Sequence, residues 1–249
     1  MADQHELQET QTGPEPVVGE YPPANEPLPP ELAEIIKPQD TAIIVVDVMD
    51  AYFDPQAVLP KLAKAGTTQL EEASHRIRGF IDESRKYPVA TTVFARLVER
   101  PESMTDNYKF KMEYKDTPPL VEVDGAGWAY HGTQPQEGDH EVVKTHYNAF
   151  SGTDLHEHLQ QRGVRTLVII GGYGSRCVAA TAIVGADVYG YNVFVPKDLI
   201  ANLDEPDTTS TRGGVDEIPG FLQALDTIWG YAPNSGSILR TWERPTTQD

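Results

Sequence analysis

The sequence of 249 residues contains a single cysteine, Cys177. This excludes an intramolecular disulfide and a zinc site built on several cysteines. Positive charge is also scarce, because 20 lysine and arginine residues stand against 38 acidic ones, and the formal net charge is -18 at pH 7. A surface of this sign repels nucleic acids and anionic membranes, so we expect neither as a partner.

Long hydrophobic runs are missing as well. No stretch approaches the roughly 18 consecutive apolar residues that a membrane-spanning helix requires. The first ten residues, MADQHELQET, have neither the basic start nor the apolar stretch of a secretory signal. We therefore expect no membrane span and a cytoplasmic location, which is the compartment where a lone thiol stays reduced.

Residues 1–40 differ in composition from the remainder, since eight of the 20 prolines fall here among acidic and polar residues. Such a segment cannot bury enough apolar surface to offset the entropy lost on ordering the chain. We expect an extended or disordered arm over 1–40, followed by one folded domain over 41–249. An arm that wraps a partner subunit is the alternative to a solvated tail.

From Thr41 onwards, apolar runs rich in β-branched residues alternate with amphipathic stretches. Buried strands are expected at 41–47, 89–95, 141–144, 166–172 and 192–198, with a short last strand near 237–239. Helices are expected at 67–86, 153–162, 177–189 and 214–229. This alternation predicts a Rossmann-like, three-layer αβα fold with about six mainly parallel strands. The long, irregular segment 97–140 fits a functional lid or a specificity element.

Three residues with reactive side chains stand at the carboxyl ends of three of these strands. Asp47 closes the first strand, Lys144 closes the third, and Cys177 follows the fourth and opens a helix. Because such strand ends share one edge of a parallel sheet, we expect the three side chains in one crevice. A helix N-terminus and the Lys144 ammonium would both lower the pKa of the Cys177 thiol. Asp47 would take the thiol proton and later activate water.

Each of the three residues also has a structural interpretation. A lone cysteine is more often a small buried hydrophobic residue, Asp47 alone would cap a turn, and Lys144 alone would be a surface lysine. Their joint placement at three strand ends is what favours catalysis. The Gly-rich turn GGYGSR before Cys177 leaves backbone N–H groups to face an oxyanion. It lacks the third glycine of a dinucleotide-binding turn and follows the wrong strand, so NAD is not expected.

Three segments of the chain resemble the isochorismatase-like hydrolases: VVDVMDAYFDP, KTHYNAFSGTDL and GSRCVAATAIVGADVYG. Members of that family carry an aspartate after an early strand, a lysine-led segment, and a cysteine that opens a helix. The middle segment is the most specific, and its matching residues are Lys144, Ala149, Phe150, Gly152, Thr153 and Leu155. The likeness spans residues 41–240, and its amidohydrolase branch includes N-carbamoylsarcosine amidase and the biuret and ureidoacrylate hydrolases.

The resemblance implies an Asp47–Lys144–Cys177 triad that hydrolyses a C–N bond of a small amide or ureido/carbamoyl compound through a thioester, with no cofactor. It further implies a non-proline cis peptide at Gly172–Tyr173. The amides of Tyr173 and Cys177 would then form the oxyanion hole. Family members commonly form dimers and tetramers, so a homo-oligomer is expected.

The sequence departs from the family's pattern at several positions. Gly174 and Ser175 replace the usual Thr and Asp of the turn, and Met49 replaces a common Gln. Residues 50–65 contain no histidine, so the metal site of nicotinamidases is not expected. True isochorismatases lack the cysteine, so Cys177 favours amide hydrolysis. An enol-ether hydrolysis that does not need Cys177, and a catalytically silent binding protein of the same fold, are the alternatives.

Residues close to the expected crevice are candidates for contact with a small-molecule substrate. The candidates are Phe53, Arg96, Tyr147, Phe150, Gly172, Arg176 and Asn202. Further residues that would shape or reach the pocket are Tyr52, Trp128, Tyr130, Tyr173 and Arg212.

Overall fold

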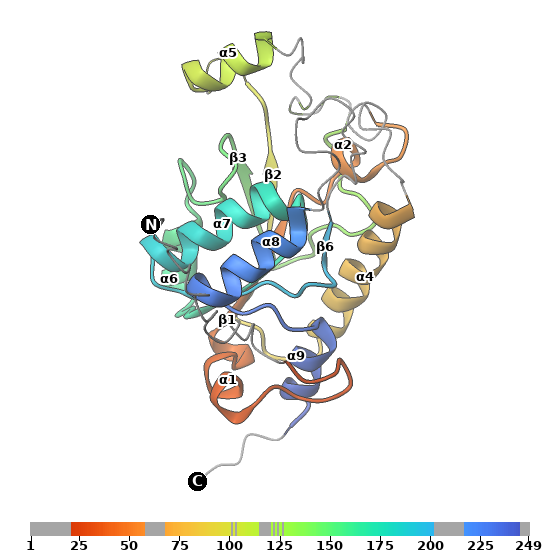
Figure 1. Cartoon of the computed structure of the whole chain (residues 1–249), viewed down its shortest axis with the longest axis vertical. Coiled ribbons are helices and arrows are strands. Elements are labelled where there is room, and N and C mark those ends of the chain that lie inside the picture. The colour runs from red at the N-terminus through yellow and green to blue at the C-terminus, as the bar shows by residue number, and fades with distance from the viewer. Residues whose placement is uncertain are drawn as a thin grey trace, which may run out of the picture.

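A six-stranded parallel sheet forms the centre of the molecule, which is seen in a computed structural model (Figure 1). The structure describes residues 21–57, 68–100, 102, 104–114, 121, 123, 125, 127–201 and 217–244. The strands are β1 (Thr41–Val46), β2 (Thr91–Leu97), β3 (His140–Lys144), β4 (Thr166–Gly172), β5 (Asn192–Phe194) and β6 (Ile200–Ala201). Their order is β3-β2-β1-β4-β5, with β6 also paired to β4.

The two central strands, β1 and β4, are buried along their whole length. Their runs of valine and isoleucine suit a strand that is covered by helices on both faces. Residue Val46 of β1 lies beside Gly171 of β4, so the carboxyl ends of both strands reach the same edge of the sheet. That edge is where an open parallel sheet binds its ligands.

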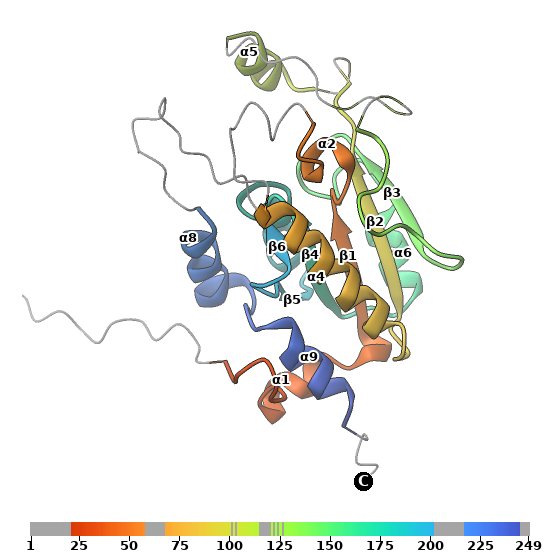
Figure 2. The same ribbon diagram turned by 90° about the vertical axis from the view of Figure 1, so that its right-hand side faces the viewer.

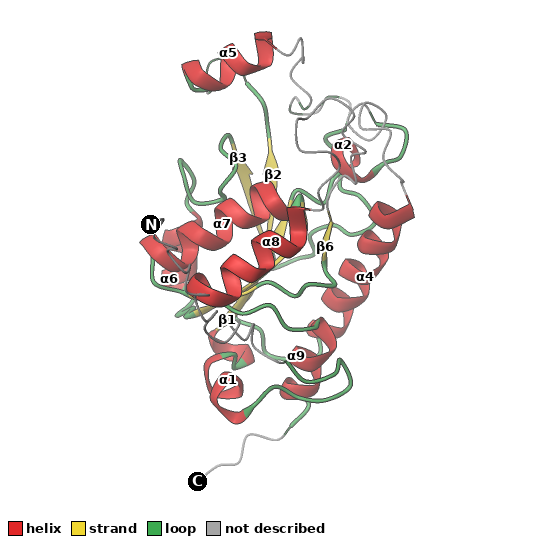
Figure 3. Cartoon of the chain, in the orientation of Figure 1, coloured by secondary structure: helices red, strands yellow, loops and turns green. Residues whose placement is uncertain are grey.

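Helices cover the sheet on both faces (Figures 2 and 3). The longest helices are α4 (Thr68–Ser84), α5 (Asp106–Tyr114), α6 (Leu155–Gln161), α8 (Glu217–Ala224, continued to Trp229) and α9 (Ser235–Trp242). One continuous helix follows β4 and comprises η2 (Gly174–Val178), α7 (Ala179–Ile183) and η3 (Val184–Val188). The short helices are α1 (Pro30–Ile35), η1 (Pro38–Asp40) and α2 (Asp50–Phe53). Among the described residues, none of these helices has the length and apolar character needed to cross a membrane.

The expected fold class is confirmed, and so are five of the expected strands. The last one is wrong, because the expected strand near 237–239 lies inside helix α9. Ile238 and Trp242, four residues apart, are both buried on one face of that helix, which is helical spacing rather than the alternation of a strand. The sixth strand is instead β6, whose two residues are too few to leave a recognisable pattern.

Residues 21–40 pack onto the domain, so the expectation of an extended or disordered arm is wrong for this part. Leu28 and Ile36 are buried. The indole Nε1 of Trp242 donates a hydrogen bond to the Ile36 carbonyl at 2.6 Å, and the Leu28 amide donates to Thr241 Oγ1 at 2.9 Å. A few apolar residues within the proline-rich segment thus supply enough burial to order it. Residues 1–20 lie outside the described residues, and an arm that wraps a partner stays a prediction.

Part of the segment 97–140, expected to be irregular, forms helix α5. This helix stands away from the sheet at the edge where β2 ends (Figures 1 and 2). Phe110 and Tyr114 are 66% and 82% exposed, so α5 presents large apolar side chains to the surface. Its position makes the segment part of the wall around the strand ends.

Candidate active site

Asp47, Lys144 and Cys177 meet at the carboxyl edge of the sheet, where the sequence places them. Asp47 directly follows β1, Lys144 is the last residue of β3, and Cys177 lies in the first turn of the helix after β4. Their exposed fractions are 1%, 0% and 6%. Strand β2 separates β1 from β3, so the long lysine side chain is what allows β3 to contribute to the cluster.

The carboxylate of Asp47 is held by the backbone around it. The residue has a φ of 51°, a left-handed conformation that is uncommon outside glycine and that often occurs at functional sites. Its Oδ1 accepts a hydrogen bond from the Leu97 amide at 2.7 Å, and its own amide donates to the Ala95 carbonyl at 2.8 Å. The turn after β1 therefore directs the second oxygen, Oδ2, towards the other two residues.

Lys144 supplies the positive charge of the cluster. Its Nζ lies 2.8 Å from Asp47 Oδ2 and donates to the His146 carbonyl at 3.3 Å. Burial lowers the pKa of Lys144, but the charge of Asp47 and the neighbouring Cys177 more than offset that effect and the pKa is raised overall. The lysine is therefore an ammonium ion and a donor at neutral pH.

The thiol of Cys177 is close enough to Asp47 and Lys144 for both groups to act on its ionisation. Burial raises the pKa of the thiol, the Asp47 charge raises it further, and Lys144 lowers it by less. The expectation of a lowered thiol pKa is therefore wrong for the resting site. The helix N-terminus and the lysine do not outweigh the removal of the thiol from water.

The turn between β4 and Cys177 is closely packed. The peptide bond between Gly172 and Tyr173 is cis, which confirms that expectation. A Cβ at Gly172 would lie 2.9 Å from the Phe53 ring, so only glycine fits against this ring. The Tyr173 carbonyl accepts from the amides of Arg176 at 3.0 Å and Val178 at 3.3 Å, which gives the first helical turn a wide, π-like geometry often found at functional sites.

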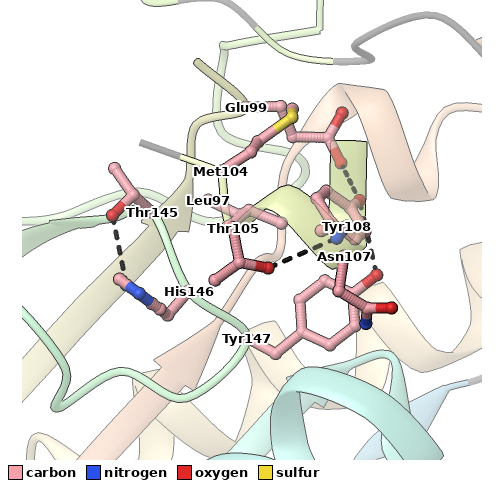
Figure 4. A pocket seen from close by; sticks show the side chains of 9 residues that line it. All are labelled: Leu97, Glu99, Met104, Thr105, Asn107, Tyr108, Thr145, His146 and Tyr147. Carbon is pink, nitrogen blue, oxygen red and sulfur yellow. Dashed lines mark hydrogen bonds between the residues drawn. The ribbon is translucent and has the colours of Figure 1, made fainter. Parts of the chain in front are cut away.

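The structure contains a pocket of about 230 Å³, and Figure 4 shows the side chains that line it. Its lining residues are Leu97, Glu99, Met104, Thr105, Asn107, Tyr108, Thr145, His146 and Tyr147. The pocket is next to the cluster because the Leu97 amide holds Asp47 and the His146 carbonyl accepts from Lys144. The three reactive side chains themselves are not part of its lining. The pocket therefore suits the part of a ligand that lies beyond the reacting group.

Glu99 and two tyrosines form the polar part of this pocket. The Tyr108 hydroxyl donates to Glu99 Oε1 at 2.8 Å, and the Tyr147 hydroxyl lies 3.4 Å from that of Tyr108. Glu99 and Tyr108 were missed as site residues from the sequence. The expected second strand ends at residue 95, whereas β2 runs to Leu97, and this shift concealed that Glu99 follows a strand end.

The expected substrate-contacting residues separate into two groups. Tyr147 lines the pocket, while Phe53, Gly172 and Arg176 lie at or against the turn that carries Cys177; the Arg176 guanidinium is 5.9 Å from the Tyr173 ring centre. The structure gives the other two described candidates, Arg96 and Phe150, different surroundings. Asn202 and Arg212 lie outside the described residues.

Arg96 and Phe150 make structural contacts. The Arg96 guanidinium lies 3.9 Å from the Trp128 ring centre and 4.0 Å from that of Tyr130, and it pairs with Glu141 at 3.0 Å. Phe150 is buried and its ring centre lies 4.8 Å from that of Tyr189. Arg96 was a candidate because it follows an expected strand, and Phe150 because it is an aromatic residue near the expected crevice. The direction of each side chain is set by packing partners that the sequence does not reveal.

The histidines of the described part make local contacts. His131 Nδ1 lies 2.8 Å from Asp50 Oδ1, and the rings of His140 and His158 stack with their centres 3.9 Å apart. Burial lowers the pKa of His158, and its neighbour His140 lowers it further. Within the described ranges, no three His, Cys, Asp or Glu side chains gather in a way that would hold a metal ion.

The chain belongs to the isochorismatase family, since the isochorismatase domain matches residues 41–212. This confirms the resemblance seen in the sequence. The chain is 28% identical over 169 residues to the ureidoacrylate amidohydrolase of Caulobacter segnis, covering 63% of this chain and 68% of that protein. It is 25% identical over 179 residues to a secreted isochorismatase effector of Verticillium dahliae, covering 72% and 80%.

The fold is shared with solved structures of this family. A cysteine hydrolase from Pseudomonas syringae pv. phaseolicola superposes with a TM-score of 0.70 at 22% identity, covering 84% of this chain and 95% of that chain. At this identity, the likeness establishes the fold. The activity has to be argued from the residues at the strand ends.

Proposed function

We propose that this protein hydrolyses the C–N bond of a small amide or ureido/carbamoyl compound, with Cys177 as the nucleophile. The observation that carries the proposal is the burial of the Cys177 thiol beside an ion pair of a carboxylate, Asp47, and an ammonium, Lys144, whose atoms lie 2.8 Å apart. A nucleophile in hydrogen-bond contact with a base that is itself held in place is the usual signature of covalent catalysis. The similarity to an amidohydrolase at 28% identity supports an amide as the substrate.

In the first half of the reaction, Asp47 accepts the thiol proton as the sulfur attacks the carbonyl carbon. The new C–S bond sends the carbonyl electron pair to oxygen, and the amides of Tyr173 and Cys177 are the proposed donors to that oxyanion. When the carbonyl re-forms, the C–N bond breaks and the nitrogen takes the proton from Asp47. Ammonia or an amine leaves, and a thioester remains on Cys177.

In the second half, water attacks the thioester carbonyl and Asp47 accepts the proton of that water. The C–S bond breaks, the acid leaves, and the thiol regains its proton from Asp47. The raised pKa of Cys177 fits this scheme, because the proton stays on sulfur until the substrate is in place. Lys144 is paired with Asp47 and stabilises the thiolate as it forms.

The test is ammonia release from a panel of primary amides, ureido acids and carbamoylated amines, measured with wild type and Cys177→Ala. We expect release from at least one class, and a loss of at least about a thousandfold in the variant. Rapid acid quenching followed by mass spectrometry should show the acyl group on the peptide that contains Cys177. Equal melting temperatures of the two proteins would show that the variant is folded.

Other outcomes separate the alternatives. Ammonia release that survives in Cys177→Ala would contradict the thiol mechanism. Turnover of isochorismate alone, unaffected by the substitution, would identify an enol-ether hydrolase. A folded protein that turns over none of these compounds would be a silent member of the family.

A further inference from the structure

Tyr52 lies in the turn of helix α2, five residues after Asp47, and is 5% exposed. Its hydroxyl has no hydrogen-bond partner among the described residues. A buried hydroxyl without a partner destabilises a protein, and a phenylalanine would fill nearly the same space without that cost. Most buried polar groups are satisfied, so an exception beside reactive residues points to a ligand.

The ring of Tyr52 is fixed in place. It packs edge to face with Tyr173, with ring centres 5.6 Å apart at 75°, and its backbone carbonyl accepts a hydrogen bond from the Tyr173 hydroxyl at 2.8 Å. Tyr173 in turn belongs to the cis peptide before the nucleophile. Tyr52 is therefore packed against the segment that leads to Cys177.

Tyr52 lies close to the reactive cluster, because it follows Asp47 by five residues and packs against Tyr173, four residues before Cys177. The acidic groups that act on the hydroxyl are Asp47 of the cluster and Glu99 of the pocket lining. Burial raises the pKa of Tyr52 well above its ordinary value, and these negative groups raise it further. The group therefore keeps its proton throughout the neutral range and presents an O–H donor.

We infer that the Tyr52 hydroxyl donates a hydrogen bond to the substrate, at an acceptor oxygen placed next to the reactive carbonyl. This inference rests on the proposed function, and it narrows the substrate class to amides that carry such a second acceptor, as dicarbonyl compounds do. A bound acceptor would satisfy the hydroxyl, whereas a simple alkyl amide would leave it unsatisfied. Selectivity of this kind is large when a site's buried polar group would otherwise stay unpaired.

The test compares two amides of equal chain length, acetoacetamide and butanamide, which differ by the 3-oxo oxygen. In Tyr52→Phe, kcat/KM for acetoacetamide should fall by about tenfold or more, while that for butanamide should change by less than about threefold. Binding of both amides is also measured by NMR titration in the Cys177→Ala background, with and without Tyr52→Phe. The same selectivity should appear there without any turnover.

A matched control is Tyr21→Phe, which removes a hydroxyl that is bonded to Asp226 and to the Ala232 amide. Tyr21→Phe should lower the melting temperature and leave kcat/KM unchanged. Tyr52→Phe should do the reverse, melting at the wild-type temperature or above it while losing acetoacetamide activity. This contrast separates a hydroxyl used for binding from one used for stability.

The inference would be overturned if Tyr52→Phe lost stability as Tyr21→Phe does. It would also be overturned if Tyr52→Phe lost affinity for both amides equally, or for neither of them. Binding of neither amide to Cys177→Ala would also overturn it. If the wild type hydrolyses neither amide but the Cys177→Ala protein still prefers acetoacetamide through Tyr52, the inference stands and the proposed hydrolysis fails.

Discussion

Asp47 sets the electrostatics of the whole cluster. Its carboxylate raises the pKa of Cys177 and of Tyr52, and it helps to raise that of Lys144. Burial is the larger cause of the raised pKa of Cys177 and of Tyr52, and Asp47 adds to it in both cases. This arrangement gives a resting site whose thiol is protected until a substrate accepts the attack.

The substitution Asp47→Asn should therefore make Cys177 more reactive towards iodoacetamide while abolishing turnover. Removing the negative charge lowers the thiol pKa, because Lys144 remains beside the sulfur. We expect the alkylation rate at pH 8 to rise by about tenfold, which corresponds to a pKa lower by about one unit. The measurement is the pH dependence of alkylation from pH 6 to 10.

The neighbouring acid Asp50, which pairs with His131 instead, provides the control. Asp50→Asn should leave the alkylation profile of Cys177 unchanged. If Asp47→Asn reacts no faster than wild type, Asp47 is not what holds the proton on the sulfur. Slow alkylation of the wild-type thiol at pH 7, by contrast, agrees with the raised pKa and with catalysis.

The sequence could predict which residues meet but not how they ionise. Position at strand ends was enough to bring Asp47, Lys144 and Cys177 together, because parallel strands share one edge. The protonation state of Cys177 depends on its burial and on the opposing effects of Asp47 and Lys144. The spacing of residues in the sequence predicts neither of these. The same limit applies to Arg96, whose two aromatic neighbours come from a segment without a regular pattern.

At the scale of elements, the end of β4 is where the fold leaves least room. Gly171 has a φ of 119°, and a Cβ there would lie 2.1 Å from the carbonyl oxygen of Val46 in β1. The two central strands therefore approach closely just before the turn that carries the cis peptide and Cys177. A glycine is required both for the backbone conformation and for this approach.

We expect Gly171→Ala to destabilise the protein by more than about 4 kcal/mol, because the methyl group would meet backbone atoms that cannot move aside. Gly163→Ala is the matched control, since Gly163 also has a positive φ of 67° but has open space around it. That variant should lose only about 1–2 kcal/mol, the strain of a left-handed alanine. Urea unfolding of both variants measures the difference, and equal losses would show that β1 does not restrict Gly171.

Elements with a strong apolar pattern were predictable, and those that depend on tertiary packing were not. Strands β1 and β4 are long, β-branched and buried on both faces, so the sequence alone defines them. Helix α9 and residues 21–40 stabilise each other through contacts between chain ends that are distant in sequence, such as the bond from Trp242 to Ile36. Local composition cannot report contacts of that kind.

At the scale of the whole molecule, we expect the buried tyrosines to make the folded state less stable at alkaline pH. Burial raises the pKa of Tyr21, Tyr52, Tyr108, Tyr130 and Tyr191 in the folded protein. In the unfolded chain these groups ionise near their ordinary pKa of about 10. Above that pH the unfolded state gains charge that the folded state cannot accommodate, and repulsion within a chain of net charge -18 acts in the same direction.

Tyr191 defines the pH range of this effect. Burial, together with a smaller contribution from the nearby Tyr189, raises its pKa to about 12. A folded-state pKa above the unfolded one stabilises the protein fully below pH 10, and that stability is lost as the pH rises towards 12. Tyr191→Phe should therefore reduce the decline of the unfolding free energy between pH 10 and 12.

Tyr114→Phe, which alters a side chain that is 82% exposed, is the control and should follow the wild-type curve. Urea unfolding at pH 8, 10, 11 and 12 measures the slopes, and a Tyr191→Phe slope equal to that of wild type would remove Tyr191 from the alkaline response.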